Sequence, residues 1–189
     1  MTKIAIFVSG SGTNCENIIR YFSNNAEVSI GLVVSNRSDA YALVRADRLG
    51  VPSVVLPKAD FAQPEKTLSL LRNHGIDFIV LAGFLLLVPP YLIEAYPRRI
   101  INLHPALLPK YGGKGMYGHH VHEAVKAAGE AETGITIHYV NAEFDRGEII
   151  AQFRTPLVAT DTVADIEKKV HELEQAHFPK VIESTVRTK

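Results

Sequence analysis

Short, uninterrupted apolar runs alternate with amphipathic helical patterns from residue 4 to residue 103, and this alternation constrains the fold of the 189-residue chain most strongly. The first run, Ile4–Val8, has no polar position, which is typical of a strand covered on both faces of a parallel sheet. Further strands are predicted at Val28–Ser35, Ser53–Leu56, Phe78–Leu81 and Ile100–Leu103, with helices at 13–24, 40–49 and 65–73 and a short helix begun by Pro89 and Pro90. Such repeated units predict an α/β fold, a Rossmann-like and mostly parallel twisted sheet with helices on both faces.

The pattern changes after His104. A glycine-rich loop, Gly112–Gly118, leads into a helix predicted at 119–128. Alternating polar and apolar residues at 133–140 and 148–155 predict an antiparallel hairpin at the C-terminal side of the sheet. A last helix is expected over 162–182, interrupted by Pro179. Because no repeat or linker divides the sequence, we expect residues 1–189 to form a single domain.

Composition excludes several classes of function. Basic and acidic residues balance at 20 each, which argues against nucleic-acid and acidic membrane partners. The longest apolar run, Phe78–Val88, is eleven residues, whereas a membrane-spanning helix needs about twenty. The single cysteine, Cys15, cannot form an internal disulfide, and no secretory leader opens the chain. We therefore expect a cytoplasmic protein.

The segment Ser9–Asn14 joins the first strand to the first helix and contains two glycines. Glycines allow close approach of the backbone to a ligand, and the amides of a helix N-terminus attract anions, so the segment predicts a phosphate-binding loop. Thr13 and Glu16 have the spacing of a capping box. Cys15 replaces the third glycine of a dinucleotide fingerprint, which disfavours NAD but leaves NADP open. The alternative is a glycine turn that only packs the helix on the sheet.

Asn102 and His104 end the fifth predicted strand and point to the same side, because side chains alternate along a strand. An amide that stabilises an oxyanion beside an imidazole that exchanges a proton suits acyl transfer to an amine. The alternative is a histidine that only terminates the strand. Asp145, in the turn 141–147, would raise the pKa of an imidazole beside it, but turn aspartates are more often turn formers.

A zinc site is a weaker hypothesis. His119 and His122 have helical ligand spacing, and His104 and His138 are further candidates. No matching glutamate or cysteine partner is evident in the sequence, so we expect no metal. We assign Cys15 to the apolar core.

Four segments together resemble the phosphoribosylglycinamide formyltransferase (glycinamide ribonucleotide transformylase) family: Ser9–Asn14, Leu81–Phe84, Asn102–Tyr111 and Phe144–Gly147. The resemblance runs from residue 1 to about residue 184. It implies a formyltransferase fold and the transfer of a formyl group from 10-formyltetrahydrofolate to the amine of N1-(5-phospho-D-ribosyl)glycinamide, a step of de novo purine biosynthesis. The expected partners are these two small molecules, and the expected assembly is a monomer or homodimer.

The resemblance also implies roles for individual residues. The implied catalytic residues are Asn102, His104 and Asp145, with His104 held cationic by Asp145. The implied ribonucleotide-binding residues are Gly12, Thr13, Asn14 and Glu174. The implied folate-binding residues are Leu85, Leu86, Leu87, Val88, Asn102, Asn141 and Asp145.

Three segments depart from the family pattern. Leu86 stands where some members carry an arginine. The stretch after the third predicted strand is shortened, so a folate-contacting arginine expected there has no clear counterpart, although Lys58 is a candidate replacement. The glycine-rich Gly112–Gly118 loop looks longer than usual.

Three alternatives remain at this point. Methionyl-tRNA formyltransferase and formyltetrahydrofolate hydrolase share the Asn-x-His-Pro motif, but each normally carries a further domain, for which we expect no room in this chain. A non-catalytic nucleotide- or folate-binding regulator is the third.

Overall fold

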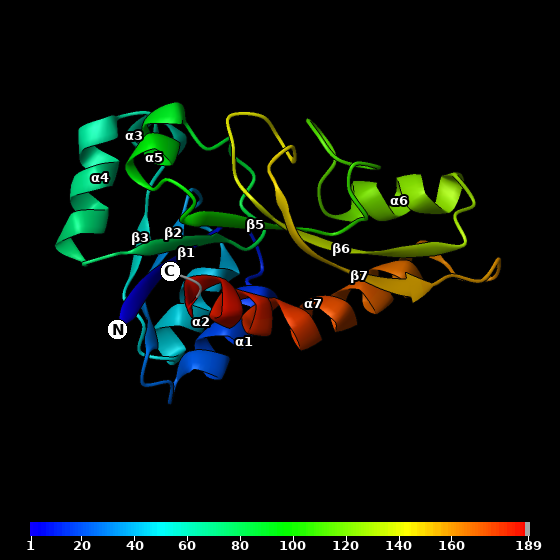
Figure 1. Cartoon of the computed structure of the whole chain (residues 1–189), viewed down its shortest axis with the longest axis horizontal. Helices are drawn as coiled ribbons and strands as arrows, with labels where there is room; N and C mark the ends of the chain where they lie inside the picture. The colour runs from blue at the N-terminus through cyan, green and yellow to red at the C-terminus, as the bar shows by residue number, and fades with distance from the viewer. Residues whose placement is uncertain (188–189) are drawn as a thin grey trace.

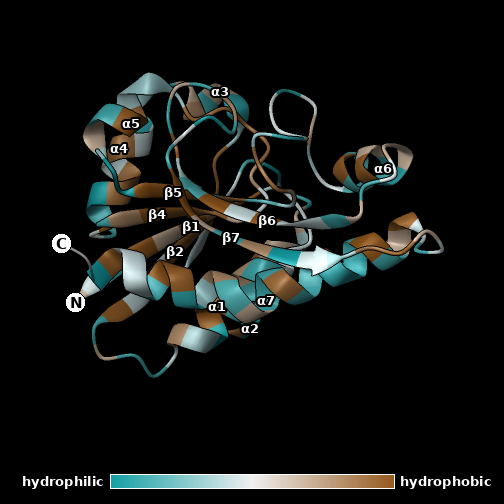
Figure 2. Ribbon diagram, turned by 45° about the vertical axis from the view of Figure 1, so that its right-hand side comes forward, coloured by the Kyte–Doolittle hydropathy of each residue, from teal (hydrophilic) through white to brown (hydrophobic). Residues whose placement is uncertain are grey.

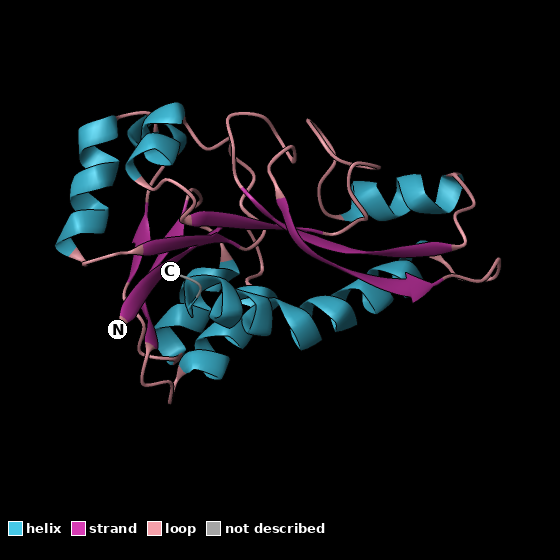
Figure 3. Ribbon diagram, viewed as in Figure 1, coloured by secondary structure: helices cyan, strands magenta, loops and turns pink. Residues whose placement is uncertain are grey.

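The computed structural model describes residues 1–187, and its centre is one mixed sheet of seven strands (Figures 1 and 3). The strands are β1 (Thr2–Val8), β2 (Val28–Ser35), β3 (Ser53–Val55), β4 (Phe78–Leu81), β5 (Ile100–His104), β6 (Glu132–Tyr139) and β7 (Ile149–Pro156). They lie in the order β3-β2-β1-β4-β5-β6-β7. The first five are parallel, whereas β6 and β7 are antiparallel to their neighbours. The predicted α/β sheet with a C-terminal hairpin is confirmed.

Helices cover both faces of this sheet (Figure 1). They are α1 (Thr13–Phe22), α2 (Tyr41–Arg48), α3 (Lys58–Phe61), α4 (Pro64–Asn73), α5 (Pro90–Ala95), α6 (His119–Ala127) and α7 (Val163–Arg187). One apolar cluster includes side chains of α1, α2, α6 and α7, and the other includes those of α3, α4 and α5. No helix among the described residues is both long and apolar enough to cross a membrane.

Alternation along β1 explains why the sheet needs both layers. Ile4, Ile6 and Val8 pack into the cluster beneath α1 and α7, while Ala5 and Phe7 pack into the cluster beneath α4 and α5. All five side chains are fully buried. The strand is therefore apolar on both sides, and Figure 2 shows that hydrophobic residues dominate the central strands.

Helix α7 differs from its prediction because it continues through Pro179 to Arg187. A proline has no backbone N–H, so the carbonyl of Gln175, four residues earlier, loses its helical partner. The side-chain amide of Asn17 on α1 donates a hydrogen bond of 3.0 Å to this carbonyl instead. Because Pro179 is also buried against the core, the helix persists where the sequence predicted an interruption.

The predicted capping box is also wrong. Gly12, not Thr13, caps α1, with a left-handed φ of 76°, and no side chain accepts a hydrogen bond at this end. A Cβ atom on Gly12 would lie 2.4 Å from the Cβ atom of Ala42 on α2, so only glycine fits here. Glu16 forms ion pairs with Arg20 and Arg45 instead.

Candidate active site

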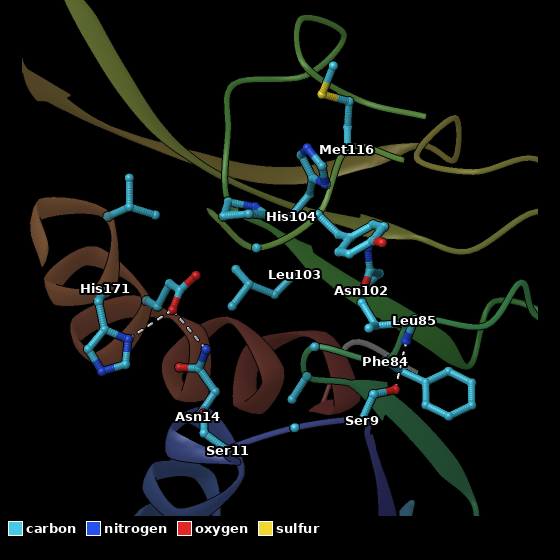
Figure 4. Close-up of a pocket in the computed structure, with 18 of the residues that line it drawn as sticks. Ser9, Ser11, Asn14, Phe84, Leu85, Asn102, Leu103, His104, Met116 and His171 are labelled. Carbon is cyan, nitrogen blue, oxygen red and sulfur yellow. Dashed lines mark hydrogen bonds and ion pairs between the residues drawn. The ribbon is translucent and has the colours of Figure 1, made fainter. Parts of the chain in front are cut away.

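A cavity of about 990 Å³ opens at the carboxyl ends of β1, β4 and β5 (Figure 4). The chain runs outward from β1 to β2 and β3, and then returns to β4 on the other side of β1. Open α/β sheets bind ligands at such a reversal of strand order, because the loops on the two sides diverge there. The sheet topology therefore places the cavity where a ligand site is expected.

The glycine-rich loop predicted to bind phosphate lines one end of this cavity. Gly12, Thr13 and Asn14 lie there at the start of α1, whose first-turn N–H groups have no partner within the helix. Glu174 of α7 lies beside them, and the Asn14 amide donates a hydrogen bond of 2.9 Å to its Oε2. The structure thus brings together the four residues predicted to bind the ribonucleotide.

His171 is a neighbour of Glu174 that the sequence did not single out. Its Nδ1 atom donates to Glu174 Oε2 at 3.1 Å, and both side chains line the cavity. This hydrogen bond to the carboxylate raises the pKa of His171 above its ordinary value. The spacing of three residues on one helix is the sequence signal that could have found it.

Asn102, His104 and Asp145 meet at another part of the same cavity. Asn102 and His104 come from the carboxyl end of β5, as the two-residue period predicted. Asp145 lies in the turn between β6 and β7, with its Oδ2 3.5 Å from His104 Nδ1 and its Oδ1 3.4 Å from Asn102 Nδ2. The predicted catalytic residues therefore form one cluster.

His138 completes this cluster, and the sequence identified it only as a candidate metal ligand. It lies on β6 directly opposite Asn102 and is 2% exposed. Its Nδ1 donates to the carbonyl of Tyr139 at 2.9 Å, so its Nε2 accepts from the Asn102 amide at 3.1 Å. Only the register between β5 and β6 reveals this partnership, and the sequence did not supply it.

Burial lowers the pKa of His104 below its ordinary value of 6.5, although the Asp145 carboxylate and the Tyr111 carbonyl act in the opposite direction. The expectation that Asp145 holds His104 cationic is therefore wrong for the unliganded protein, because desolvation of the imidazolium outweighs the attraction. His104 Nε2 lies 2.7 Å from the Tyr111 carbonyl. Since a carbonyl only accepts, the neutral ring carries its proton on Nε2 and its lone pair on Nδ1, facing Asp145.

Asp145 is ionised in this setting. Burial alone would raise its pKa, but its contacts within this cluster, among them the hydrogen bond from the Gly113 N–H, hold that pKa below its ordinary value. The Gly113 N–H donates to Asp145 Oδ2 at 2.9 Å. Asp145 also has a left-handed φ of 54°, an uncommon conformation for a residue other than glycine. The carboxylate is thus held between the β5 cluster and the glycine-rich loop.

The residues predicted to bind folate divide into two groups. Leu85 lines the cavity, and its N–H donates to Ser9 Oγ at 2.9 Å, which joins this segment to the end of β1. Leu86, Leu87 and Val88 do not line the cavity, and Val88 is buried in the core.

Asn141 and Lys58 also lie away from the cavity lining. Asn141 stabilises the β6–β7 turn, donating to the Arg146 carbonyl at 3.0 Å and accepting from the Glu143 N–H at 3.0 Å. Lys58 begins α3, is exposed and is not among the residues that line the cavity.

Most of the glycine-rich loop lines the cavity beside the catalytic cluster, from Gly113 to Gly118. His122 of α6 lines it as well, whereas His119 pairs with Glu167 on α7. Within residues 1–187, no group of three or more His, Cys, Asp or Glu side chains is arranged to hold a metal ion.

Comparison with known families identifies the class of protein. The sequence profile of the formyl transferase family matches residues 2–182, nearly the whole chain. The chain therefore belongs to the formyl transferase family, and this membership implies a folate-derived formyl donor.

Named relatives narrow the class to phosphoribosylglycinamide formyltransferases, which confirms the resemblance seen in the motifs. The chain is 41% identical over 186 residues to the chloroplastic phosphoribosylglycinamide formyltransferase of Arabidopsis thaliana, covering 95% of this chain and 64% of the relative. It is 35% identical to the phosphoribosylglycinamide formyltransferase of Haemophilus influenzae, covering 96% of this chain and 86% of the relative. The chain spans 60% of the length of a second plant relative, from Vigna unguiculata.

Solved structures of similar proteins share the whole fold. The phosphoribosylglycinamide formyltransferase of Anaplasma phagocytophilum superposes with a TM-score of 0.90 at 31% identity, covering 100% of this chain and 88% of that one. The enzyme of the same name from Streptococcus pneumoniae gives 0.85 at 38% identity, covering 97% of this chain and 98% of that one. The formyltransferase fold expected from the sequence is confirmed.

Proposed function

We propose that the protein transfers the formyl group of 10-formyltetrahydrofolate to the amine of N1-(5-phospho-D-ribosyl)glycinamide, giving the N2-formyl product and tetrahydrofolate for purine biosynthesis. One observation carries the proposal: a phosphate-type loop and an amide–imidazole–carboxylate cluster line the same cavity. The 35–41% identity to proteins named for this reaction supports the choice of substrates.

The two ends of the cavity suit the two ends of the ribonucleotide. The first-turn amides of α1 at Gly12, Thr13 and Asn14 offer donors to a phosphate. Glu174 accepts hydrogen bonds from ribose hydroxyls nearby. The glycinamide amine then extends toward His104, while the folate enters beside Leu85 and the β6–β7 turn.

His104 moves the proton in this mechanism. The amine nitrogen attacks the formyl carbon, a C–N bond forms, and the carbonyl oxygen becomes an oxyanion. Neutral His104 accepts the proton of the attacking amine at Nδ1 and becomes an imidazolium between Asp145 and the Tyr111 carbonyl. When the bond from carbon to the folate nitrogen breaks, His104 returns the proton to that nitrogen, so no net proton is consumed.

Asn102 stabilises the oxyanion through its side-chain amide. One N–H is engaged by His138 at 3.1 Å, whereas the contact with Asp145 is long, at 3.4 Å. The N–H that faces Asp145 is therefore the one available to the developing oxygen charge.

We also propose that residues 1–189 act as one catalytic domain on small molecules in the cytoplasm, as a monomer or homodimer. A single sheet supports both ends of the cavity, and the net charge of zero offers no general attraction for nucleic acid.

Tetrahydrofolate release measured with both substrates tests this function. We expect release to require the ribonucleotide. Equal release with water as the only acceptor would instead identify a hydrolase, and release that depends on aminoacylated tRNA would identify a tRNA formyltransferase. Binding of both substrates without release would identify a regulator.

A further inference from the structure

The outer side of the phosphate loop is held by α2, a helix with no predicted role in the site. The N–H of Ala42 donates to the carbonyl of Gly10 at 3.2 Å. The guanidinium of Arg45 donates through Nε to the carbonyl of Ser11 at 2.8 Å. Two consecutive carbonyls of the loop are therefore fixed by one helix.

Fixing these carbonyls also fixes the N–H groups that follow them. In a trans peptide the C=O and the next N–H point in opposite directions. With the carbonyls of Gly10 and Ser11 directed at α2, the N–H groups of Ser11 and Gly12 are directed away from it. Both residues line the cavity, and Figure 4 shows Ser11 in the loop beside it.

Arg45 is itself held in place by contacts on two sides. It forms an ion pair with Glu16 in the first turn of α1, and its guanidinium lies 5.0 Å from the centre of the Tyr41 ring. Its side chain is only 25% exposed. Because Arg45 is paired with Glu16 and does not itself line the cavity, it acts on the loop through hydrogen-bond geometry more than through attraction of an anion.

We propose that Arg45 is a positioning residue for the phosphate loop, which it holds in the conformation that presents backbone N–H groups to the phosphate of the ribonucleotide. The inference rests on the proposed function, because that function supplies the phosphorylated substrate. Arg45 touches neither reacting group, so its loss should affect binding of one substrate and leave the chemical step intact.

Steady-state kinetics of Arg45→Gln test this role. Loss of a hydrogen bond to a charged group predicts a rise of at least about tenfold in KM for the ribonucleotide, with kcat and KM for the folate within about twofold of wild type. Arg45→Lys keeps the charge and one donor, so it should recover part of the loss. A KM for the ribonucleotide that is unchanged in Arg45→Gln would overturn the proposal, as would an equal loss of kcat. If Arg45→Gln does not fold, Arg45→Lys decides: an unchanged KM overturns the proposal.

Arg48 offers a matched control on the same helix. Its guanidinium lies 5.8 Å from the centre of the same Tyr41 ring and donates to Tyr41 Oη at 3.1 Å. Among the described residues, 1–187, no hydrogen bond joins Arg48 to the phosphate loop. Arg48→Gln should leave both KM values unchanged. An equal rise in KM for Arg48→Gln would show that any disturbance of α2 suffices, and the specific role of Arg45 would be lost.

Calorimetric titration with ribose 5-phosphate separates this inference from the proposed function. The ligand carries the phosphate and the ribose but no formyl acceptor. We expect Arg45→Gln to weaken its binding at least about tenfold. Suppose that wild type binds ribose 5-phosphate but releases no tetrahydrofolate in the assay with both substrates. The proposed reaction then fails, whereas the effect of Arg45→Gln on phosphate binding is still measured. If wild type does not bind ribose 5-phosphate, the inference is overturned.

Discussion

The two ends of the cavity are built in different ways. The phosphate end is local: Gly12, Thr13 and Asn14 are consecutive and offer mostly backbone groups. The catalytic end is assembled from distant segments, since Asn102 and Asp145 are 43 residues apart and His138 joins them only through strand pairing. A local, backbone-built site depends on conformation, whereas an assembled one depends on side chains held in register. Substitutions should therefore act on binding at one end and on turnover at the other.

The largest effect is expected at Asp145. Asp145→Asn keeps the shape of the side chain but removes the charge that stabilises the His104 imidazolium, so kcat should fall by about 10²–10⁴-fold. KM for the ribonucleotide should change little, because the phosphate end is untouched. Steady-state kinetics with each substrate varied measure the split. A variant with normal kcat would remove Asp145 from the mechanism.

A smaller effect on turnover is expected at His138. His138→Leu removes the acceptor for the Asn102 amide and leaves Asn102 free to reorient, so kcat should fall by about tenfold, the effect of one lost hydrogen bond of about 1.4 kcal/mol. His138→Gln can place an amide oxygen near the same position and should recover part of kcat. If both variants lower kcat equally and also lower the thermal midpoint, His138 is a packing residue only.

At the phosphate end, Gly12→Ala should weaken binding and leave the chemical step intact. The new Cβ would lie 2.4 Å from that of Ala42, and the left-handed φ would be strained. We expect an increase in KM for the ribonucleotide and a decrease of about 1–3 kcal/mol in the free energy of unfolding. Gly50→Ala is the matched control, since Gly50 also has a left-handed φ, of 68°, but lies outside the cavity lining and its Cβ would meet no atom within 4 Å. If the two substitutions raise KM for the ribonucleotide equally, phosphate binding does not depend on the backbone conformation at Gly12.

The smallest effect is a pH dependence that belongs to the catalytic end. Because burial lowers the pKa of His104, the neutral base persists below pH 6.5, and the acid limb of kcat/KM should lie below that pH. The unfolded chain takes up this proton first as the pH falls, so the free energy of unfolding should decrease below about pH 6.5. If the acid limb of kcat/KM lies above pH 6.5 instead, the pKa of His104 is raised, and the expectation that Asp145 holds His104 cationic is correct.

Sequence reasoning succeeded where the determinant is periodic or contiguous. The apolar run Ile4–Val8, the loop Ser9–Asn14 and the Asn102–His104 pair are all short-range patterns, and the structure places each as expected. Family resemblance was needed to connect Asp145 to His104, because nothing local encodes that contact.

The features that the sequence did not predict correctly have a common cause, because each depends on tertiary contacts. The β5–β6 register determines the role of His138, and the close approach of α2 determines that Gly12 caps α1. Desolvation is the main cause of the lowered pKa of His104, and it depends on how deeply the folded chain buries that ring.

The proline in α7 has a consequence for how the substrate pocket is aligned. Pro179 leaves the Gln175 carbonyl without its helical partner, and the Asn17 side-chain amide donates a hydrogen bond to this carbonyl. With Tyr21 bonded to Glu183 at 2.6 Å one turn further along α1, the two helices cannot slide past each other by a turn. Glu174 directly precedes Gln175 in the chain. The backbone N–H that Pro179 lacks, five residues away, therefore helps to place Glu174 beside Asn14.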